Sequence, residues 1–144
     1  MKSKVTDGAT LIINQALSIG LAQVCKKAAK IWDFHDFLFT FLKSETYVSY
    51  YTDETLFSQA PGYVLQIFKE ELDNKHIAYP KSSTILDTDI AHWMGYLIGQ
   101  WNLNYEININ NFNDTQYNWL YFGYDTLHTQ STGYVLDLFL SEAE

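Results

Sequence analysis

The sequence predicts an all-α protein, a single helical domain made of two similar halves. Three observations lead to this prediction. Apolar residues recur at helical spacing in several segments. A stretch of 22 residues recurs in similar form 71 positions later, and 47% of the 144 residues are apolar. Such a composition is sufficient to bury a core without help from a metal or a disulfide.

The first helix is expected to begin after Asp7 and to extend to about residue 30. Its apolar stripe is predicted to contain Ile12, Ala16, Ile19, Val24 and Ala28. Three lysines lie near the C-terminal end of this helix, where positive charges suit the negative end of the helix dipole. We expect them to face solvent: Lys26, Lys27 and Lys30. The single cysteine, Cys25, is expected to be a buried structural thiol.

Asp33 is predicted to cap a second helix, with His35 and Asp36 on its surface. The apolar face of this helix contains Phe34, Phe37, Leu38, Phe41 and Leu42. The stretch ETYVSYY (45–51) is expected to form a short helix, and Pro61 to take the first position of the next one. The apolar stripe of that next helix is Val64, Ile67, Phe68 and Leu72.

A connector is expected at about residues 78–88, which carry the second proline and two serines. A helix capped by Asp89 should follow, and its apolar face contains Ile90, Trp93, Met94, Leu97, Ile98 and Trp101. Gly95 and Gly99, four positions apart, would allow another helix to cross closely. Residues 105–109 are interpreted as a connector, with a short strand as the alternative. A short aromatic helix and a closing helix complete the chain.

Residues 50–71 and 121–142 align without gaps and share ten identities. We infer two pseudo-repeats, at about 8–73 and 82–144, within one domain. One copy alone could not cover its apolar stripes, whereas two copies packed face to face could, which predicts a pseudo-twofold arrangement. The alternative is that GYVL recurs only because both helices begin in the same way.

The net charge of −8 and the nine Lys and Arg residues argue against direct binding of nucleic acid, because phosphate binding needs many cations. An acidic chain could instead meet a basic partner surface, as an acidic inhibitor of the phage type would. No apolar run of 18 residues and no basic-then-apolar opening segment are seen, so we expect no membrane span and a cytoplasmic location.

The titratable residues form no recognisable catalytic or metal-binding pattern. HExxH, CxxC, GxSxG and phosphate-loop motifs are absent from the sequence, so neither a metal nor a cofactor is expected. The most suggestive group is Tyr124, Asp125 and His128, because a carboxylate near a histidine raises the histidine pKa and orients the ring. The favoured interpretation of this group is stabilisation of a loop, and a functional role is the alternative. Asp125 and His128, together with His92, are candidates for a pocket at the pseudo-axis.

Three short motifs carry a family resemblance: GYVLQIFKEEL (62–72), DIAHWMGYLIGQW (89–101) and HT (128–129). Over roughly residues 34–140 the chain resembles small, mostly uncharacterised bacterial proteins that are often encoded beside ADP-ribosyltransferase-like proteins in toxin–antitoxin-like loci. In that family an aromatic residue and an arginine follow the Met-Gly-Tyr step. This sequence has Leu97, Ile98, Gly99 and Gln100 there. The resemblance implies a neutralising or accessory partner and assigns no enzyme activity to a residue.

The leading functional hypothesis is a non-enzymatic protein-binding protein, an antitoxin-like partner of a bacterial toxin. Tyrosine and tryptophan are the usual anchors of protein interfaces. The candidate partner-binding residues are Trp93, Tyr96, Trp101, Trp119 and Tyr121. The alternative is an enzyme or small-molecule binder that uses a pocket with His92, Asp125 and His128, and a third hypothesis is the acidic inhibitor. The oligomeric state is left open.

Overall fold

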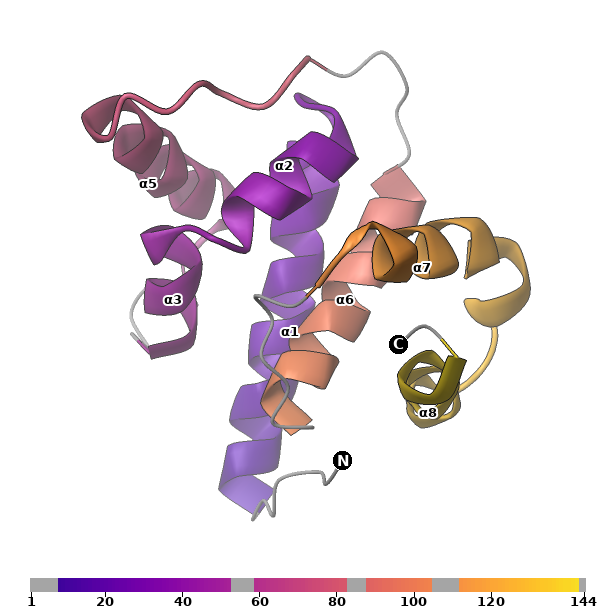
Figure 1. Ribbon diagram of the computed structural model, residues 1–144. Helices are drawn as coiled ribbons and strands as arrows, with labels where there is room; N and C mark the ends of the chain where they lie inside the picture. Colours follow the sequence, from indigo (N-terminus) through magenta and orange to yellow (C-terminus); the bar gives the residue numbers. More distant parts are fainter. Residues whose placement is uncertain (1–7, 53–58, 83–87, 105–111, 143–144) are drawn as a thin grey trace.

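The computed structural model describes residues 8–52, 59–82, 88–104 and 112–142. They form the helices α1 (Gly8–Ala28), α2 (Phe34–Phe41), α3 (Glu45–Thr52), α5 (Pro61–Asn74), α6 (Thr88–Asn104), α7 (Asp114–Leu127) and α8 (Thr132–Glu142) (Figure 1). Within these ranges no strand is found, and a single antiparallel bridge joins Trp32 to Ser82. The all-α prediction is therefore confirmed.

The long helices α1 and α6 pack against each other at the centre of the molecule (Figure 1). Gly95 lies against Ala22 and Cys25, and Gly99 lies against Ser18, so the helices run antiparallel. A Cβ atom at Gly95 would lie 2.9 Å from the Cys25 sulfur and 3.0 Å from the Ala22 Cα. The predicted close crossing at the two glycines is thus confirmed.

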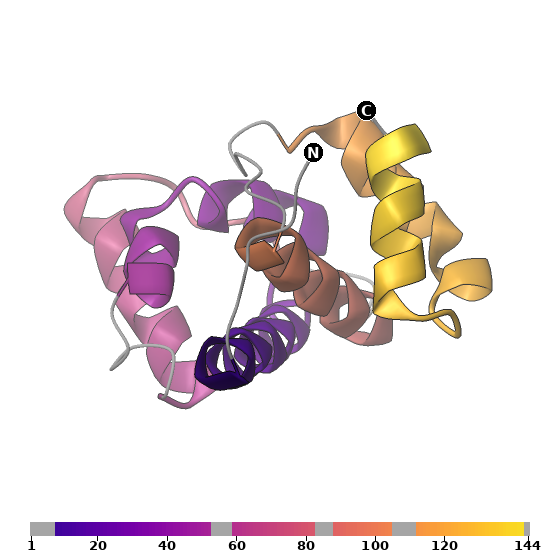
Figure 2. The same ribbon diagram turned by 90° about the horizontal axis from the view of Figure 1, so that it is seen from below.

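The remaining helices flank this pair on two sides. Seen from below, α3 and α5 lie on the α1 side of the pair, whereas α7 and α8 lie on the α6 side (Figure 2). The helix α2 packs on α1. A single cluster of buried apolar side chains includes residues from all seven described helices. On the α1 side its centre is aromatic: the Phe37 and Phe41 rings are stacked at 5.1 Å, and Phe68 meets both rings edge-on.

Local capping fixes where several helices begin. The Asp33 side chain accepts a hydrogen bond from the Asp36 amide, which confirms it as the N-cap of α2. Pro61 is the first residue of α5, as predicted. At α7, the Asn113 side chain and the Gln116 side chain each accept a hydrogen bond from the other's backbone N–H, forming a capping box.

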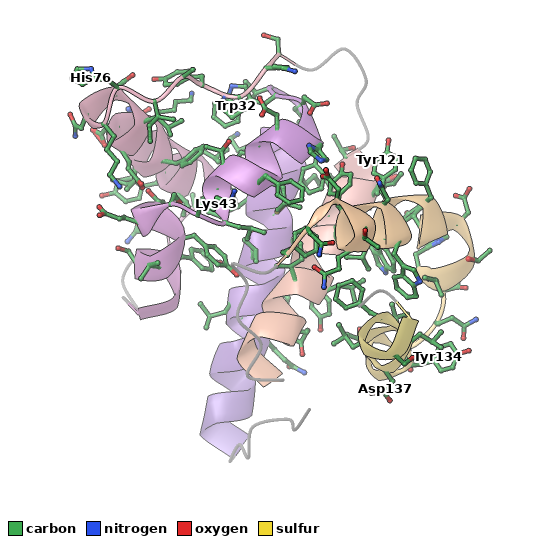
Figure 3. All side chains as sticks on the ribbon, viewed as in Figure 1. Trp32, Lys43, His76, Tyr121, Tyr134 and Asp137 are labelled. Atoms are coloured by element: carbon green, nitrogen blue, oxygen red, sulfur yellow. The ribbon has the colours of Figure 1, made fainter. Side chains whose placement is uncertain are left out.

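The chain that leaves α5 is fastened to the start of α2. Lys81 accepts a hydrogen bond from the Asp33 amide at 2.7 Å and donates its own amide to the Asp36 carboxylate at 2.7 Å. The Tyr79 ring meets Trp32 edge-on at 6.3 Å, and Figure 3 labels Trp32. Residues 77–82 therefore form an ordered extended connection, in agreement with a connector near 78–88; residues 83–87 lie outside the described ranges.

Two details of the sequence prediction are wrong. The buried face of α1 contains Leu17, Ser18, Leu21, Ala22, Val24, Cys25 and Ala28. Ile19, which was placed in the stripe, is 49% exposed, and Ala16 is exposed too, because the face of α1 that packs on α6 is centred on Ser18, Ala22 and Cys25. Asp89 was expected to be an N-cap, but α6 begins at Thr88, so Asp89 lies in the first turn. The expected connector at 105–109 lies outside the described residues.

Candidate functional site

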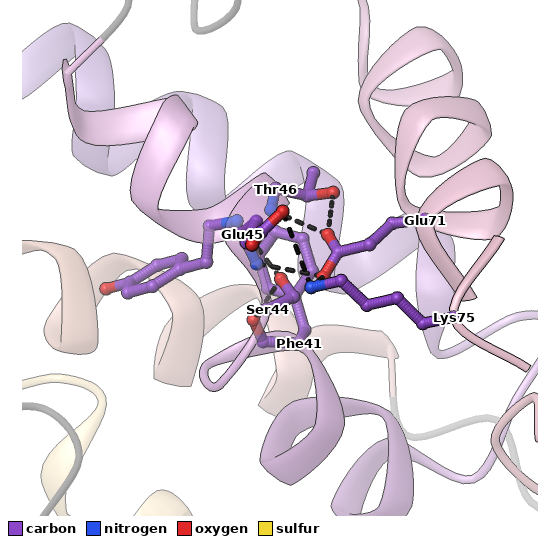
Figure 4. Close-up of polar contacts among 7 residues, drawn as sticks. Phe41, Ser44, Glu45, Thr46, Glu71 and Lys75 are labelled. Carbon is purple, nitrogen blue, oxygen red and sulfur yellow. Dashed lines mark hydrogen bonds and ion pairs between the residues drawn. The ribbon is translucent and has the colours of Figure 1, made fainter. Parts of the chain in front are cut away.

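Two hollows among the described residues bear on function, and the first is polar. It lies between α3 and α5 and has a volume of about 330 Å³. The Glu71 carboxylate accepts hydrogen bonds from the Glu45 amide, the Thr46 amide and the Thr46 hydroxyl, at 2.9, 2.7 and 2.6 Å (Figure 4). Lys75 donates to the same carboxylate at 3.0 Å. A side chain from α5 thus binds the free amides at the start of α3.

Burial raises the pKa of Glu71, but the hydrogen bonds from the Thr46 hydroxyl, the two amides and Lys75 outweigh it, so the net pKa lies below its usual value. Glu71 is therefore a carboxylate at neutral pH. Its lone pairs are already bonded to the protein, and its side chain is only 10% exposed. We interpret this hollow as a structural junction between α3 and α5.

The second hollow is lined by aromatic and titratable side chains from three helices. It has a volume of about 380 Å³, and its walls are Lys26 from α1, Asp89, His92, Trp93 and Tyr96 from α6, and Tyr124 and His128 from the end of α7. The Tyr124 ring meets Trp93 edge-on at 5.5 Å and stacks on His128 at 4.2 Å. We call this hollow the aromatic pocket.

The hydrogen bond of His128 determines its tautomer. Its Nδ1 lies 2.6 Å from the backbone carbonyl oxygen of Tyr124. A carbonyl oxygen only accepts, so Nδ1 carries the proton and Nε2 of the neutral ring is an acceptor. This bond runs to the Tyr124 carbonyl and not to the Asp125 carboxylate with which the sequence suggested a pairing.

His92 is held in its neutral form at neutral pH. Burial lowers its pKa, the nearby positive charge of Lys26 lowers it further, and the Asp89 carboxylate opposes these effects less strongly. Its pKa consequently lies below the ordinary value of 6.5. The electrostatic field of Lys26 therefore reaches the aromatic pocket.

The structure brings some predicted site residues together and separates others. His92, Trp93, Tyr96 and His128 all line the aromatic pocket, although they were assigned to two different hypotheses. Asp125 is exposed and is not among the lining residues.

Trp119 is half-buried and packs on Phe139 of α8 at 5.6 Å. Tyr121 stacks on Tyr117 at 5.6 Å and meets the exposed Phe122 edge-on. Figure 3 shows Tyr121 on α7 and Tyr134 on α8. The side chain of Trp101 lies outside what the structure describes. Trp119 and Tyr121 are not among the residues that line the aromatic pocket.

Sequence reasoning missed two residues of the aromatic pocket. Lys26 was assigned to a solvated face and Asp89 to a helix cap, but both line the pocket. The repeat gives a signal for the α6 wall of the pocket, although not for these two residues: a shift of 71 positions places His92, Trp93 and Tyr96 opposite Leu21, Ala22 and Cys25. Polar or large aromatic residues therefore occupy positions whose counterparts are small or apolar.

A surface contact between α2 and α7 was also missed. His35 Nε2 lies 2.6 Å from the Asp114 carboxylate, and the His35 ring packs on Phe39 and Tyr117. In the described ranges, no group of three or more His, Cys, Asp or Glu residues is arranged to hold a metal ion. No described helix is both long and apolar enough to span a membrane.

Comparison of the chain with protein-family models, with curated proteins and with solved structures found no match.

Proposed function

We propose that this protein is a non-enzymatic binding protein and that it recognises its partner through the aromatic pocket. The observation that carries the proposal is the convergence of three aromatic and two histidine side chains from α6 and α7 on one hollow. Aromatic side chains around a partly desolvated pocket are the usual anchor points of protein interfaces. The pocket could accept one side chain of the partner.

A comparison of equivalent positions on α1 and α6 supports this proposal. Leu21, Ala22 and Cys25, the counterparts of the pocket residues, are at most 1% exposed. In contrast, His92 is exposed, and Trp93 and Tyr96 are half-buried. The face that α1 buries in the core is thus left open on α6, where it carries aromatic and polar groups. Folding alone does not require such groups at an open position.

We also propose that the chain consists of two similar halves. In support, α5 and α8 begin at residues 61 and 132, a difference of 71, and α5 packs on α1 as α8 packs on α6. A shift of 71 positions pairs Val24 with Gly95, the residue at the close crossing. Separately expressed fragments 1–82 and 83–144 should be insoluble alone and should form a helical complex when mixed. Independent folding of each fragment would contradict mutual shielding.

The binding proposal is tested with two matched double variants. His92→Ala combined with Tyr124→Ala changes the aromatic pocket, and His76→Ala combined with Tyr134→Ala removes an exposed histidine and tyrosine elsewhere. Affinity capture from the native host should yield a protein retained by the wild type and the control pair. The pocket pair should weaken its binding about tenfold or more, as for anchor residues. Equal retention by all three proteins would exclude the pocket.

We further propose that the partner is a bacterial toxin, which the resemblance of the sequence to accessory proteins of toxin–antitoxin-like loci suggests. The product of an adjacent gene is the first candidate to test. Its expression alone should arrest growth, and co-expression of the wild-type chain should restore it. Co-expression of the pocket double variant should not restore growth. An adjacent product without effect on growth would remove this partner assignment and leave the binding site to the capture experiment.

A small-molecule binder, with or without enzyme activity, is the second candidate. The pocket volume of about 380 Å³ favours it, because small-molecule sites fall in this range. The position of the pocket beside the Gly95 crossing is also near the pseudo-axis of the proposed halves. This candidate predicts that a compound from host extract remains bound to the purified wild-type protein, and native mass spectrometry detects it.

A further inference from the structure

The walls of the aromatic pocket indicate what shape of group it accepts. Trp93 and Tyr96 come from one helix and Tyr124 from another, so aromatic side chains of two helices line the hollow. Trp93 and Tyr96 are only half-buried, which leaves ring surface available. Such rings prefer offset-stacked or edge-to-face contacts with another ring. A volume of about 380 Å³ is near the small end for ligand sites and suits one small ring system.

The charges of the aromatic pocket indicate the second part of the group. Lys26 provides the single Lys or Arg side chain of the lining and Asp89 the single carboxylate. Both charges act on His92: Lys26 lowers its pKa, and Asp89 raises it less strongly. The ammonium N–H groups of Lys26 and the ring N–H of a neutral His92 are hydrogen-bond donors that an anion could use.

We propose that the aromatic pocket binds a planar aromatic ring that carries a carboxylate. The ring lies between Trp93, Tyr96 and Tyr124, and the carboxylate is paired with Lys26. This inference rests on the proposed function, because it assigns the chemistry of the group that enters the same site. The group is either part of the partner protein or a free compound.

Three probes with the same ring test the proposal by isothermal titration calorimetry on the full chain. Indole-3-acetate is an anion, indole-3-acetamide is its neutral counterpart, and tryptamine is a cation. The acetate should bind about three- to fivefold more tightly than the acetamide, the range for a solvent-exposed charge pair. Tryptamine should bind most weakly. Equal binding of acetate and acetamide, tightest binding of tryptamine, or no binding of any probe would overturn the assignment.

Variants locate the two parts of the site. Lys26→Gln should reduce the acetate-to-acetamide preference to about one while leaving acetamide binding unchanged. Lys69→Gln is the matched control, because Lys69 lies over another tryptophan, Trp32, at 5.6 Å and outside the pocket; it should keep the preference. Tyr124→Ala should weaken all three probes. A preference that survives in Lys26→Gln contradicts the role given to this lysine.

Failure of the ligand class can be told apart from failure of the proposed function. If no probe binds but the pocket double variant loses the captured partner, the ring-and-carboxylate assignment is wrong and the protein-binding proposal stands. If the probes bind as expected and the partner is retained by every variant, the binding proposal is wrong. If excess indole-3-acetate displaces the captured partner, the ring with its carboxylate belongs to the partner protein. If the partner is not displaced, the ring with its carboxylate belongs to a free compound.

Discussion

The close contact between α1 and α6 predicts that Gly95→Ala destabilises the protein. The added Cβ would lie 2.9 Å from the Cys25 Sγ, 3.0 Å from the Cys25 Cβ and 3.0 Å from the Ala22 Cα. Real Cβ atoms hardly ever approach other heavy atoms below 3.0 Å. Since the Ala22 Cα belongs to the backbone, a rotamer change cannot relieve the contact, and the two helices must move apart.

The magnitude follows from two opposing terms. Overpacking a tight contact costs about 1–3 kcal/mol, and the backbone contact at Ala22 places this site near the upper end. Replacing glycine by alanine inside a helix returns about 1 kcal/mol. We therefore expect a net loss of about 2 kcal/mol from the free energy of unfolding, a large part of the usual 5–15 kcal/mol of a domain.

Urea denaturation followed by circular dichroism measures this loss. Gly133→Ala is the matched control: Gly133 lies in the first turn of α8, and nothing lies within 4 Å of its added Cβ. This control should gain up to about 1 kcal/mol. If Gly95→Ala is as stable as the wild type while Gly133→Ala gains stability as expected, the close packing of α1 on α6 is wrong.

Three further predictions concern other sites. His76 has a left-handed backbone (φ 56°) after α5, so His76→Gly should raise the free energy of unfolding by about 1 kcal/mol in urea denaturation; a loss would contradict this geometry. Glu71 has a lowered pKa, so its stabilisation is present above the unfolded pKa of about 4.5 and is lost as the pH falls through the folded pKa. Glu71→Gln should cost about 1–3 kcal/mol at pH 7, and its difference from the wild type should shrink in acid titrations; a constant difference would exclude the ionised cap. His92 also has a lowered pKa, so the unfolded chain binds more protons and stability should fall as the pH drops through about 6.5. In His92→Gln the urea midpoint should depend less on pH around 6.5 than in the wild type. An unchanged pH dependence would show that groups other than His92 cause the loss of stability.

Elements that depend on local interactions could be predicted from the sequence. Asp33 caps α2 and Pro61 opens α5, because both effects involve residues within one helical turn. The capping box at Asn113 was equally local and visible as an Asn followed three positions later by Gln, but it was not used. The buried face of α1 was predicted incorrectly, because the helices that pack against α1 decide which of its faces is buried. Helical spacing alone fits more than one face when apolar residues are frequent.

The aromatic pocket depends on tertiary packing and could be predicted only in part. His92 and His128 were candidates, but nothing local shows that the end of α7 approaches α6 or that Lys26 joins them. The Glu71 contact with Thr46 is similar, because the two residues are 25 positions apart and meet only when α5 lies across the start of α3. Conversely, Gly95 and Gly99 indicated that α6 is in close contact with another helix, but they did not identify that helix as α1.

The central pair also constrains how the chain is made. Val24 and Gly95 are separated by 71 positions, so during synthesis at about 5–20 residues per second the partner of α1 appears roughly 4–14 s later. During this delay the small apolar surface at Ala22 and Cys25 lacks the helix that covers it in the folded protein. The loop that must close to bring the two helices together is also long. The nascent protein therefore passes through an interval in which chaperones, or premature association with another nascent copy, compete for that surface.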